Sequence, residues 1–161
     1  MAHRVTWTTL AGAGGIVVHE NTVLLVRQRR PYGFYWEFPS GYYEPGESFE
    51  EATAREVLEE TAIAVGVGEL VCTMLWEREH DSRRNVIAYF AATPLDPLAE
   101  PRAQTEEGIE EVAFVDPLDF AGIHPLHQAI LERWWETRSC GFHVHADVLV
   151  QADGTQSYVF R

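Results

Sequence analysis

Three glutamates in one short predicted helix constrain this chain more than any other feature. Glu56, Glu59 and Glu60 stand at positions i, i+3 and i+4, so they share one face of a helix. Like charges at this spacing repel one another, and the helix dipole disfavours anions in the last turns. A bound hard divalent cation would stabilise this arrangement, because Mg²⁺ and Mn²⁺ prefer carboxylate oxygens. A solvated acidic helix face is the alternative explanation for three glutamates alone.

The residues before the glutamates predict a strand, a glycine-rich loop and a helix in that order. Residues 36–40 have the composition of a strand, and Gly41 follows them. The pair Pro45-Gly46 then predicts a turn. Ser48 and Glu51 have the spacing of a capping box, so we expect the helix to begin near residue 48.

The helix itself has one polar and one apolar face. Arg55 lies four residues before Glu59, and we expect it to hold that side chain in one orientation. Ala54, Val57 and Leu58 fall on the opposite face and are expected to pack against a core.

At these residues the chain resembles the Nudix hydrolase family. The family signature is a glycine, five residues, a glutamate, seven residues and then Arg-Glu-aliphatic-x-Glu-Glu-x-Gly-aliphatic. Ala62 stands where the signature has its second glycine. The flanking strand pattern extends the resemblance to roughly residues 8–138. The residues that match the signature are Gly41, Glu47, Arg55, Glu56, Val57, Glu59, Glu60 and Ile63.

The resemblance implies a metal-dependent catalytic site. It implies that the metal ligands are Glu56, Glu59, Glu60 and the carbonyl of Gly41, with Glu56 also a candidate base. Glu47 and Arg55 are expected to orient the loop and helix. The resemblance also implies one further acid that contributes to the site from a distant loop. The candidates are Glu106, Glu107, Glu110 and Glu111, and the alternative is that these four form a solvated run of surface charges. Glu107 is preferred because it lies in the loop before a strand, so the predicted catalytic set is Glu56, Glu59, Arg55 and Glu107.

Substrate-binding candidates come from the arginine-rich and aromatic segments. Arg29 and Arg30 could contact phosphates, although arginines near strand ends are also ordinary solubilising residues. Tyr35 and Tyr43 could stack on a nucleobase or plug the core beneath the loop. His143 and His145 share one strand face, but without a third ligand nearby in sequence a structural or surface role is favoured over metal binding.

Elsewhere the pattern favours an α+β or α/β fold. The resemblance implies a Nudix-type α/β/α sandwich with a mixed central sheet. We expect an aromatic loop over residues 31–36, a hairpin loop over 80–85, a mobile loop over 93–108 and a helix of about a dozen residues after Pro125. The predicted strands are 14–18, 22–26, 70–76, 86–92 and 112–115.

The last residues predict a separate β-hairpin. Alternation over 143–150 and 156–161 flanks a turn with Asp153-Gly154, a strong hairpin signal. An isolated hairpin is marginal in water, so this one must dock on its domain or pair with a second chain in a homodimer. We therefore divide the chain into a Nudix domain, 1–138, and a C-terminal extension, 139–161.

Composition limits the partners. The 161 residues suit one globular domain, and a net charge of −13 argues against binding long nucleic acids. The negative net charge is still compatible with a small phosphorylated substrate, because bound metal ions would neutralise the substrate's charge. The chain has no apolar run long enough to span a membrane. Cys72 and Cys140 are too few for a disulfide framework and are expected to be reduced, small apolar residues, which makes a cytoplasmic setting the default.

The sequence therefore predicts a hydrolase that uses Mg²⁺ or Mn²⁺ to split a diphosphate linkage. The expected substrate is a nucleoside triphosphate or another nucleoside diphosphate joined to a group X, cleaved to the nucleoside monophosphate and phospho-X. Two alternatives stay open: a hydrolase of a non-nucleotide diphosphate, and a regulatory module that binds nucleotides without catalysis.

Overall fold

The first strand organises the fold, because it pairs on both sides. The structure is a computed structural model that describes residues 6–161. Its strands are β1 (Thr8–His19), β2 (Thr22–Arg30), β3 (Gly33–Glu37), β4 (Ser40–Tyr42), β5 (Val65–Arg78), β6 (Arg83–Pro94), β7 (Ile109–Val115), β8 (Phe142–Val150) and β9 (Gln156–Phe160). Its helices are α1 (Phe49–Thr61) and α2 (Pro125–Trp134), with short 3₁₀ turns η1 (Glu79–Asp81) and η2 (Thr105–Glu107).

The strands form one mixed sheet in the order β3-β2-β1-β6-β5-β8-β9, with β4 paired to β1 and β7 to β2. Parallel pairing joins β1 to β6 and β5 to β8, and the other neighbours are antiparallel. The mixed sheet with two helices confirms the predicted fold class.

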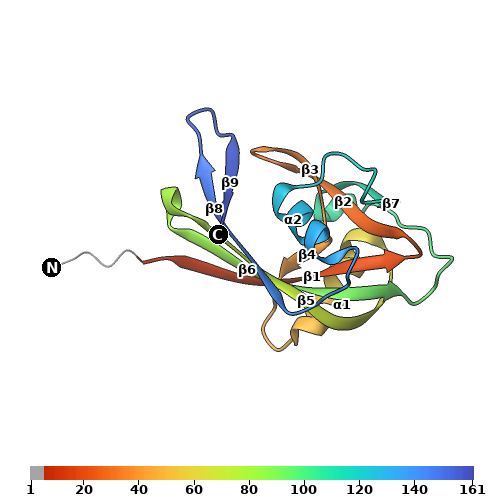
Figure 1. The fold of residues 1–161 in the computed structure, drawn as a ribbon. Helices are drawn as coiled ribbons and strands as arrows, with labels where there is room; N and C mark the ends of the chain where they lie inside the picture. The colour runs from red at the N-terminus through yellow and green to blue at the C-terminus, as the bar shows by residue number, and fades with distance from the viewer. Residues whose placement is uncertain (1–5) are drawn as a thin grey trace.

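Alternation along β1 and β2 gives the sheet two buried faces. Ile16 and Leu25 belong to the core under α2, whereas Val17 and Leu24 belong to the core under α1. Successive strand residues point to opposite faces, so the two helices cover opposite sides of the sheet (Figure 1). The larger core, under α2, also buries Phe38, and Trp36 packs against it.

Several local expectations need correction. The aromatic segment predicted as a loop over 31–36 contains β3, because Gly33–Glu37 pair with β2. The predicted loop 80–85 already contains the start of β6 at Arg83. Leu58 is 49% exposed and lies outside the core, and Cys140 is exposed while Cys72 is buried. The segment 93–108 lacks long regular elements as expected, but its mobility stays a prediction.

The C-terminal residues form the expected hairpin, and it docks on its own chain. Phe142–Asp147 of β8 pair in parallel with Cys72–Glu77 of β5, and β9 pairs back on β8. Figure 1 shows this hairpin projecting from the sheet on the same side as α2. Within residues 6–161 no helix is both long and apolar enough to cross a bilayer. The division at residue 138 stays a prediction, since the hairpin shares the sheet of the preceding domain.

Candidate active site

The helix that carries the three glutamates is fixed at both ends by its own sequence. The Glu51 amide donates to Ser48 Oγ at 3.1 Å, and the Ser48 amide donates to Glu51 Oε2 at 2.7 Å, which completes the capping box. At the other end Ala62 adopts a left-handed conformation with φ 61°. Alanine is strained there by about 1 kcal/mol relative to glycine. The helix still extends to Thr61, so it keeps all three glutamates that are predicted to bind metal.

Close packing sets the height of α1 above the sheet. A Cβ at Gly15 of β1 would lie 2.8 Å from Val57 Cγ2, so only glycine lets the helix approach this closely. Val57, Thr53 and Ala52 are buried against the strands. This contact holds the glutamates beside the loop that leads into the helix.

Arg55 joins the loop to the helix through its guanidinium. Its Nε donates to Glu47 Oε1 at 2.6 Å, and its Nη2 donates to the Tyr42 carbonyl at 3.1 Å. Its Nη1 contacts Glu56 Oε1 at 2.7 Å and Glu59 Oε2 at 3.0 Å. One cation thus contacts three carboxylates and the backbone of the loop, an arrangement compatible with the orienting role, which stays a prediction.

Glu56 lies against the backbone of Gly41. A Cβ at Gly41 would collide with the Glu56 carboxylate, so any larger residue here would displace that side chain from its position. Burial raises the pKa of Glu56; the Arg55 guanidinium offsets part of this rise, and the negative charges of Glu59 and Glu107 add to it. The carboxylate is therefore held in a position where its charge is poorly solvated.

Glu60 is the most deeply buried of the three. Only 5% of it is exposed, and it accepts hydrogen bonds from Gln28 Nε2 and the Ser40 amide, both at 3.2 Å. Burial raises the pKa of Glu60 well above its usual value, and the Glu56 charge adds to this. Glu59 is the most open, with 43% of its side chain exposed.

The donor set fits a divalent cation. Glu47, Glu56 and Glu59 share the single guanidinium of Arg55, and Glu60 receives its hydrogen bonds from neutral groups. Negative charge therefore exceeds positive charge at this partly buried site, and the atoms that could coordinate a metal are carboxylate oxygens. Oxygen donors in such excess are what Mg²⁺ and Mn²⁺ bind.

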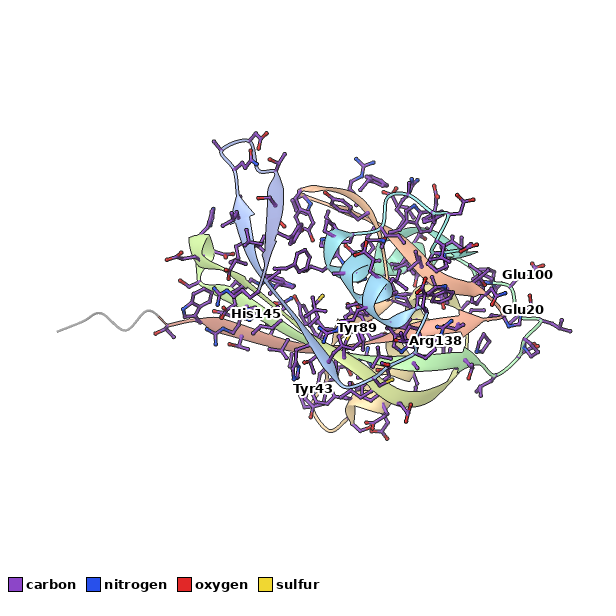
Figure 2. The ribbon with its side chains drawn as sticks, in the orientation of Figure 1. Glu20, Tyr43, Tyr89, Glu100, Arg138 and His145 are labelled. Carbon is purple, nitrogen blue, oxygen red and sulfur yellow. The ribbon has the colours of Figure 1, made fainter. Side chains whose placement is uncertain are left out.

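A pocket of about 630 Å³ opens from these carboxylates. Gly41, Glu56 and Glu60 line one end, and Val150 and Gln156 of the C-terminal hairpin line another part. Its size lies within the range of small-molecule sites, about 300–1,000 Å³. Tyr89 contributes to its floor and lies between the sheet and α2 (Figure 2).

The four substrate-binding candidates lie in different environments. Arg30 lines the pocket but pairs with buried Glu37 at 2.7 Å, whereas the Arg29 side chain is 74% exposed and faces Glu110. Tyr35 packs edge-on against His124, with ring centres 5.0 Å apart. Tyr43 packs on Phe49 at the start of α1, away from the pocket lining. Contact of these four residues with substrate stays a prediction.

The candidate acids before and within β7 separate into two groups. Glu110 and Glu111 pair with Arg29 and Arg27 across the strands. Glu107 ends η2, is exposed, and lies near enough for its charge to act on Glu56. Its position is compatible with the expected contribution to the site, and its catalytic role stays a prediction.

The two histidines of β8 differ. His145 lies with Glu77 and Asp147 in a group whose ligand atoms are within 4.8 Å of one another, while His143 contacts Thr73. Figure 2 shows His145 near the base of the hairpin. Arg84 pairs with Glu77 and Arg161 with Asp147, so both carboxylates already have cationic partners. This group is best described as a charge network that ties the hairpin to the sheet.

Sequence reasoning missed several pocket residues. Asn85 is buried in β6 and its Nδ2 reaches the Tyr42 hydroxyl at 3.4 Å, yet the sequence suggested a loop there. Gln28 contacts Glu60 from β2, and Gln156 enters from β9. A polar residue at an inward position of a strand was the available signal, because such positions normally bury apolar side chains.

Comparison with known proteins decides the family. The NUDIX domain model matches residues 8–134, most of the chain. The chain belongs to the Nudix hydrolase family. The 8-oxo-dGTP diphosphatase of Proteus vulgaris is 31% identical over 86 residues, which cover 50% of this chain and 73% of that protein. The ADP-ribose pyrophosphatase of Methanocaldococcus jannaschii is 35% identical over 75 residues, covering 46% of this chain and 44% of the relative.

Solved structures of Nudix proteins share the fold. The MutT protein of Bacillus halodurans superposes with a TM-score of 0.72 at 22% identity, covering 94% of this chain and 97% of that one. A Nudix hydrolase of Nitrosomonas europaea gives a TM-score of 0.70 at 24% identity, covering 91% and 84%. Several curated relatives match over less than half of their own length, as with 36% of the MutT-like protein of Streptomyces ambofaciens.

Proposed function

We propose that this protein is a divalent-metal-dependent pyrophosphohydrolase acting on a small nucleoside diphosphate derivative. The observation that carries the proposal is the glutamate group itself. Glu56 and Glu60 lie beside Gly41 at the end of a pocket large enough for a nucleotide, and Arg55 links Glu56 to Glu59. The family supports hydrolysis, and the relatives are named for 8-oxo-dGTP and ADP-ribose, both nucleoside diphosphate derivatives.

The residues around the glutamates would have separate roles in metal binding, orientation and proton transfer. Glu56, Glu59 and Glu60 would hold the cation, with Mg²⁺ or Mn²⁺ preferred, and the Gly41 carbonyl would add a ligand. A bound cation of this kind supplies Lewis-acid activation of phosphate and water. Arg55 orients two of the carboxylates, and Glu56 or Glu107 would accept the proton of the attacking water. Cleavage at phosphorus then yields a nucleoside monophosphate and phospho-X.

The charge arrangement favours catalysis over a purely binding module. A module that only bound nucleotides would gain nothing from a cluster of carboxylates facing an anionic ligand, since like charges repel. Here the three glutamates are all present, and Glu60 is buried at the cost of desolvation. A catalytic cation explains why the chain tolerates this cost.

The test is a panel of diphosphate compounds assayed on the purified protein. The panel contains dGTP, 8-oxo-dGTP, ADP-ribose and UDP-glucose, each with Mg²⁺, with Mn²⁺ and with excess chelator, and products are separated by chromatography. We expect at least one compound to give a nucleoside monophosphate only when metal is present. Full activity in chelator would overturn the metal requirement, and inactivity on every compound would favour the binding module or a non-nucleotide substrate.

A further inference from the structure

One side of the pocket is lined by residues that lie beyond the matched family domain. The NUDIX model ends at residue 134, whereas Val150, Gly154 and Gln156 of the β8–β9 hairpin line the pocket. In the antiparallel register Val150 lies opposite Gln156, and Val148 lies opposite Tyr158. Partners directly opposite share one face of a sheet, so these four side chains form a common inner face of the hairpin.

That inner face is anchored to the domain by one tyrosine. Tyr158 Oη lies 2.8 Å from His124 Nε2, and the two rings meet edge-on at 4.9 Å. The Leu126 amide donates to Nδ1 of His124 at 3.2 Å, so that nitrogen carries no proton. Burial lowers the pKa of His124 to about 4, which keeps the ring neutral near pH 7. The ring proton is therefore on Nε2, and it is donated to the Tyr158 hydroxyl.

The tautomer of His124 then decides how Gln156 points. Because the Tyr158 oxygen accepts from His124, its own hydrogen is free to be donated to Gln156 Oε1, 3.1 Å away. The Gln156 amide nitrogen is left with its hydrogens, and within residues 6–161 it has no hydrogen-bond acceptor. Gln156 thus presents an oriented N–H donor at the pocket wall.

The charges around the pocket indicate what this donor would meet. Beyond the glutamates, Arg30 pairs with Glu37 at 2.7 Å and Arg78 pairs with Asp81 at 2.6 Å. Arg83 also lines the pocket, but its Nη2 donates to the Tyr42 hydroxyl beside the glycine loop, at the glutamate side. The two ion pairs leave the lining next to the hairpin close to electrically balanced, so that part favours an uncharged polar group over further phosphates. A neutral donor such as the Gln156 amide suits a carbonyl or hydroxyl oxygen.

We propose that the β8–β9 hairpin is a specificity wall that binds the uncharged nucleoside part of the substrate, with Gln156 donating to one of its oxygens and Tyr158 positioning Gln156. The inference rests on the proposed function, because it assumes that the diphosphate lies at the glutamates. The oxygen acceptor is a base carbonyl or a ribose hydroxyl, which offer the same chemistry to an amide N–H.

The experiment measures binding by calorimetry with probes that cannot be cleaved between the phosphates. The probes are the α,β-methylene diphosphates of adenosine, guanosine and 2′-deoxyguanosine, together with methylenediphosphonate, all with Mg²⁺. The variants are Gln156→Ala and Tyr158→Phe, and Ser157→Ala on the outer face of β9 is the matched control. Thermal melts confirm that each variant is folded at the working temperature.

We expect Gln156→Ala and Tyr158→Phe to raise the Kd of the nucleoside probes about three- to tenfold, the usual range for one hydrogen bond. Methylenediphosphonate should bind all variants equally, and Ser157→Ala should match the wild type. A loss confined to the guanosine probes indicates a base carbonyl, a loss absent for 2′-deoxyguanosine indicates the 2′ hydroxyl, and an equal loss for all three indicates another ribose oxygen. Unchanged nucleoside affinity in both inner-face variants, or equal loss for methylenediphosphonate, overturns the proposal.

Failure of this inference differs from failure of the proposed function. If the hairpin plays no part, the wild type still hydrolyses a panel compound with metal, and Gln156→Ala has an unchanged KM. If the protein is not a hydrolase of nucleotides, the panel is inactive whatever the variant. In turnover assays we expect Gln156→Ala to have a raised KM and a nearly unchanged kcat. This pattern results when a lost contact stabilised the bound substrate and the transition state equally.

Discussion

The two ends of the pocket are built in opposite ways. The glutamate end uses residues close together in the chain: Ser48 and Glu51 cap α1, and Arg55 reaches back only eight residues to Glu47. The hairpin end depends on β8 pairing with β5, some seventy residues earlier, and on Tyr158 reaching His124. Short-range contacts leave a pattern in the sequence, whereas the second arrangement exists only once the sheet has formed.

The two ends also differ in charge. At the glutamate end carboxylates outnumber cations, and Glu60 is buried among neutral donors. Toward the hairpin, Arg30 pairs with Glu37 and Arg78 with Asp81, and Gln156 and Tyr158 add neutral hydrogen-bonding groups. The first end is suited to a cation and phosphates, and the second to an uncharged group.

The largest effect is expected from removing one charge at the glutamate end. Glu59→Gln and Glu60→Gln should each lower kcat by roughly a hundredfold or more, because a lost ligand removes several kcal/mol of charge stabilisation. Without metal, both variants should melt at the same temperature as the wild type or higher, since repulsion is relieved. Glu50→Gln, in the first turn of the same helix, is the control for the loss of one charge. Markedly lower melting of both variants without metal would mean that the glutamates serve folding.

The hairpin end should make stability sensitive to acid through His124. Its pKa is lowered to about 4 in the folded protein, so between there and the unfolded value of about 6.5 the unfolded chain binds more protons. Stability should therefore rise with pH across this window and fall on acidification, by about 3 kcal/mol in total from this group.

Urea unfolding at several pH values measures this dependence. His124→Asn keeps an oxygen acceptor at the N-cap of α2 but removes the titrating ring, so the free energy of unfolding should change less with pH. An unchanged pH dependence in His124→Asn would contradict the assignment.

Packing of the hairpin on β5 can be tested within one strand. Val144 is 7% exposed and belongs to the main core, whereas Leu149 on the same strand is 51% exposed. Val144→Ala should lower the free energy of unfolding by about 2 kcal/mol, and Leu149→Ala by less than about 0.5 kcal/mol. Denaturant unfolding of the two variants decides the point, and equal losses would show that β8 is not seated on the core as described.

The smallest effect is expected at the end of α1. Ala62→Gly should raise the free energy of unfolding by about 0.5–1 kcal/mol, because glycine adopts φ 61° without strain. Ala54→Gly, inside the same helix, should have the opposite sign and a similar size, since glycine weakens a helix interior. Thermal melts of both variants provide the measurement, and a destabilised Ala62→Gly would refute the strained cap.

The sequence by itself determined the glutamate end of this protein and its fold class. The capping box, the reach of Arg55 and the face shared by Glu56, Glu59 and Glu60 follow from helical periodicity, and the hairpin follows from Asp153-Gly154 between alternating residues. These features depend on residues only a few positions apart.

Only the tertiary structure decided what faces the glutamates. The pairing of the hairpin with its own domain depended on the edge of β5, which no local pattern reveals, and a homodimer stays a prediction. Sheet formation likewise brought Asn85, Gln28 and Gln156 into one pocket and placed Tyr43 outside its lining. Their neighbours are set by strand order and register, and a one-residue shift in register would send each of these side chains to the other face.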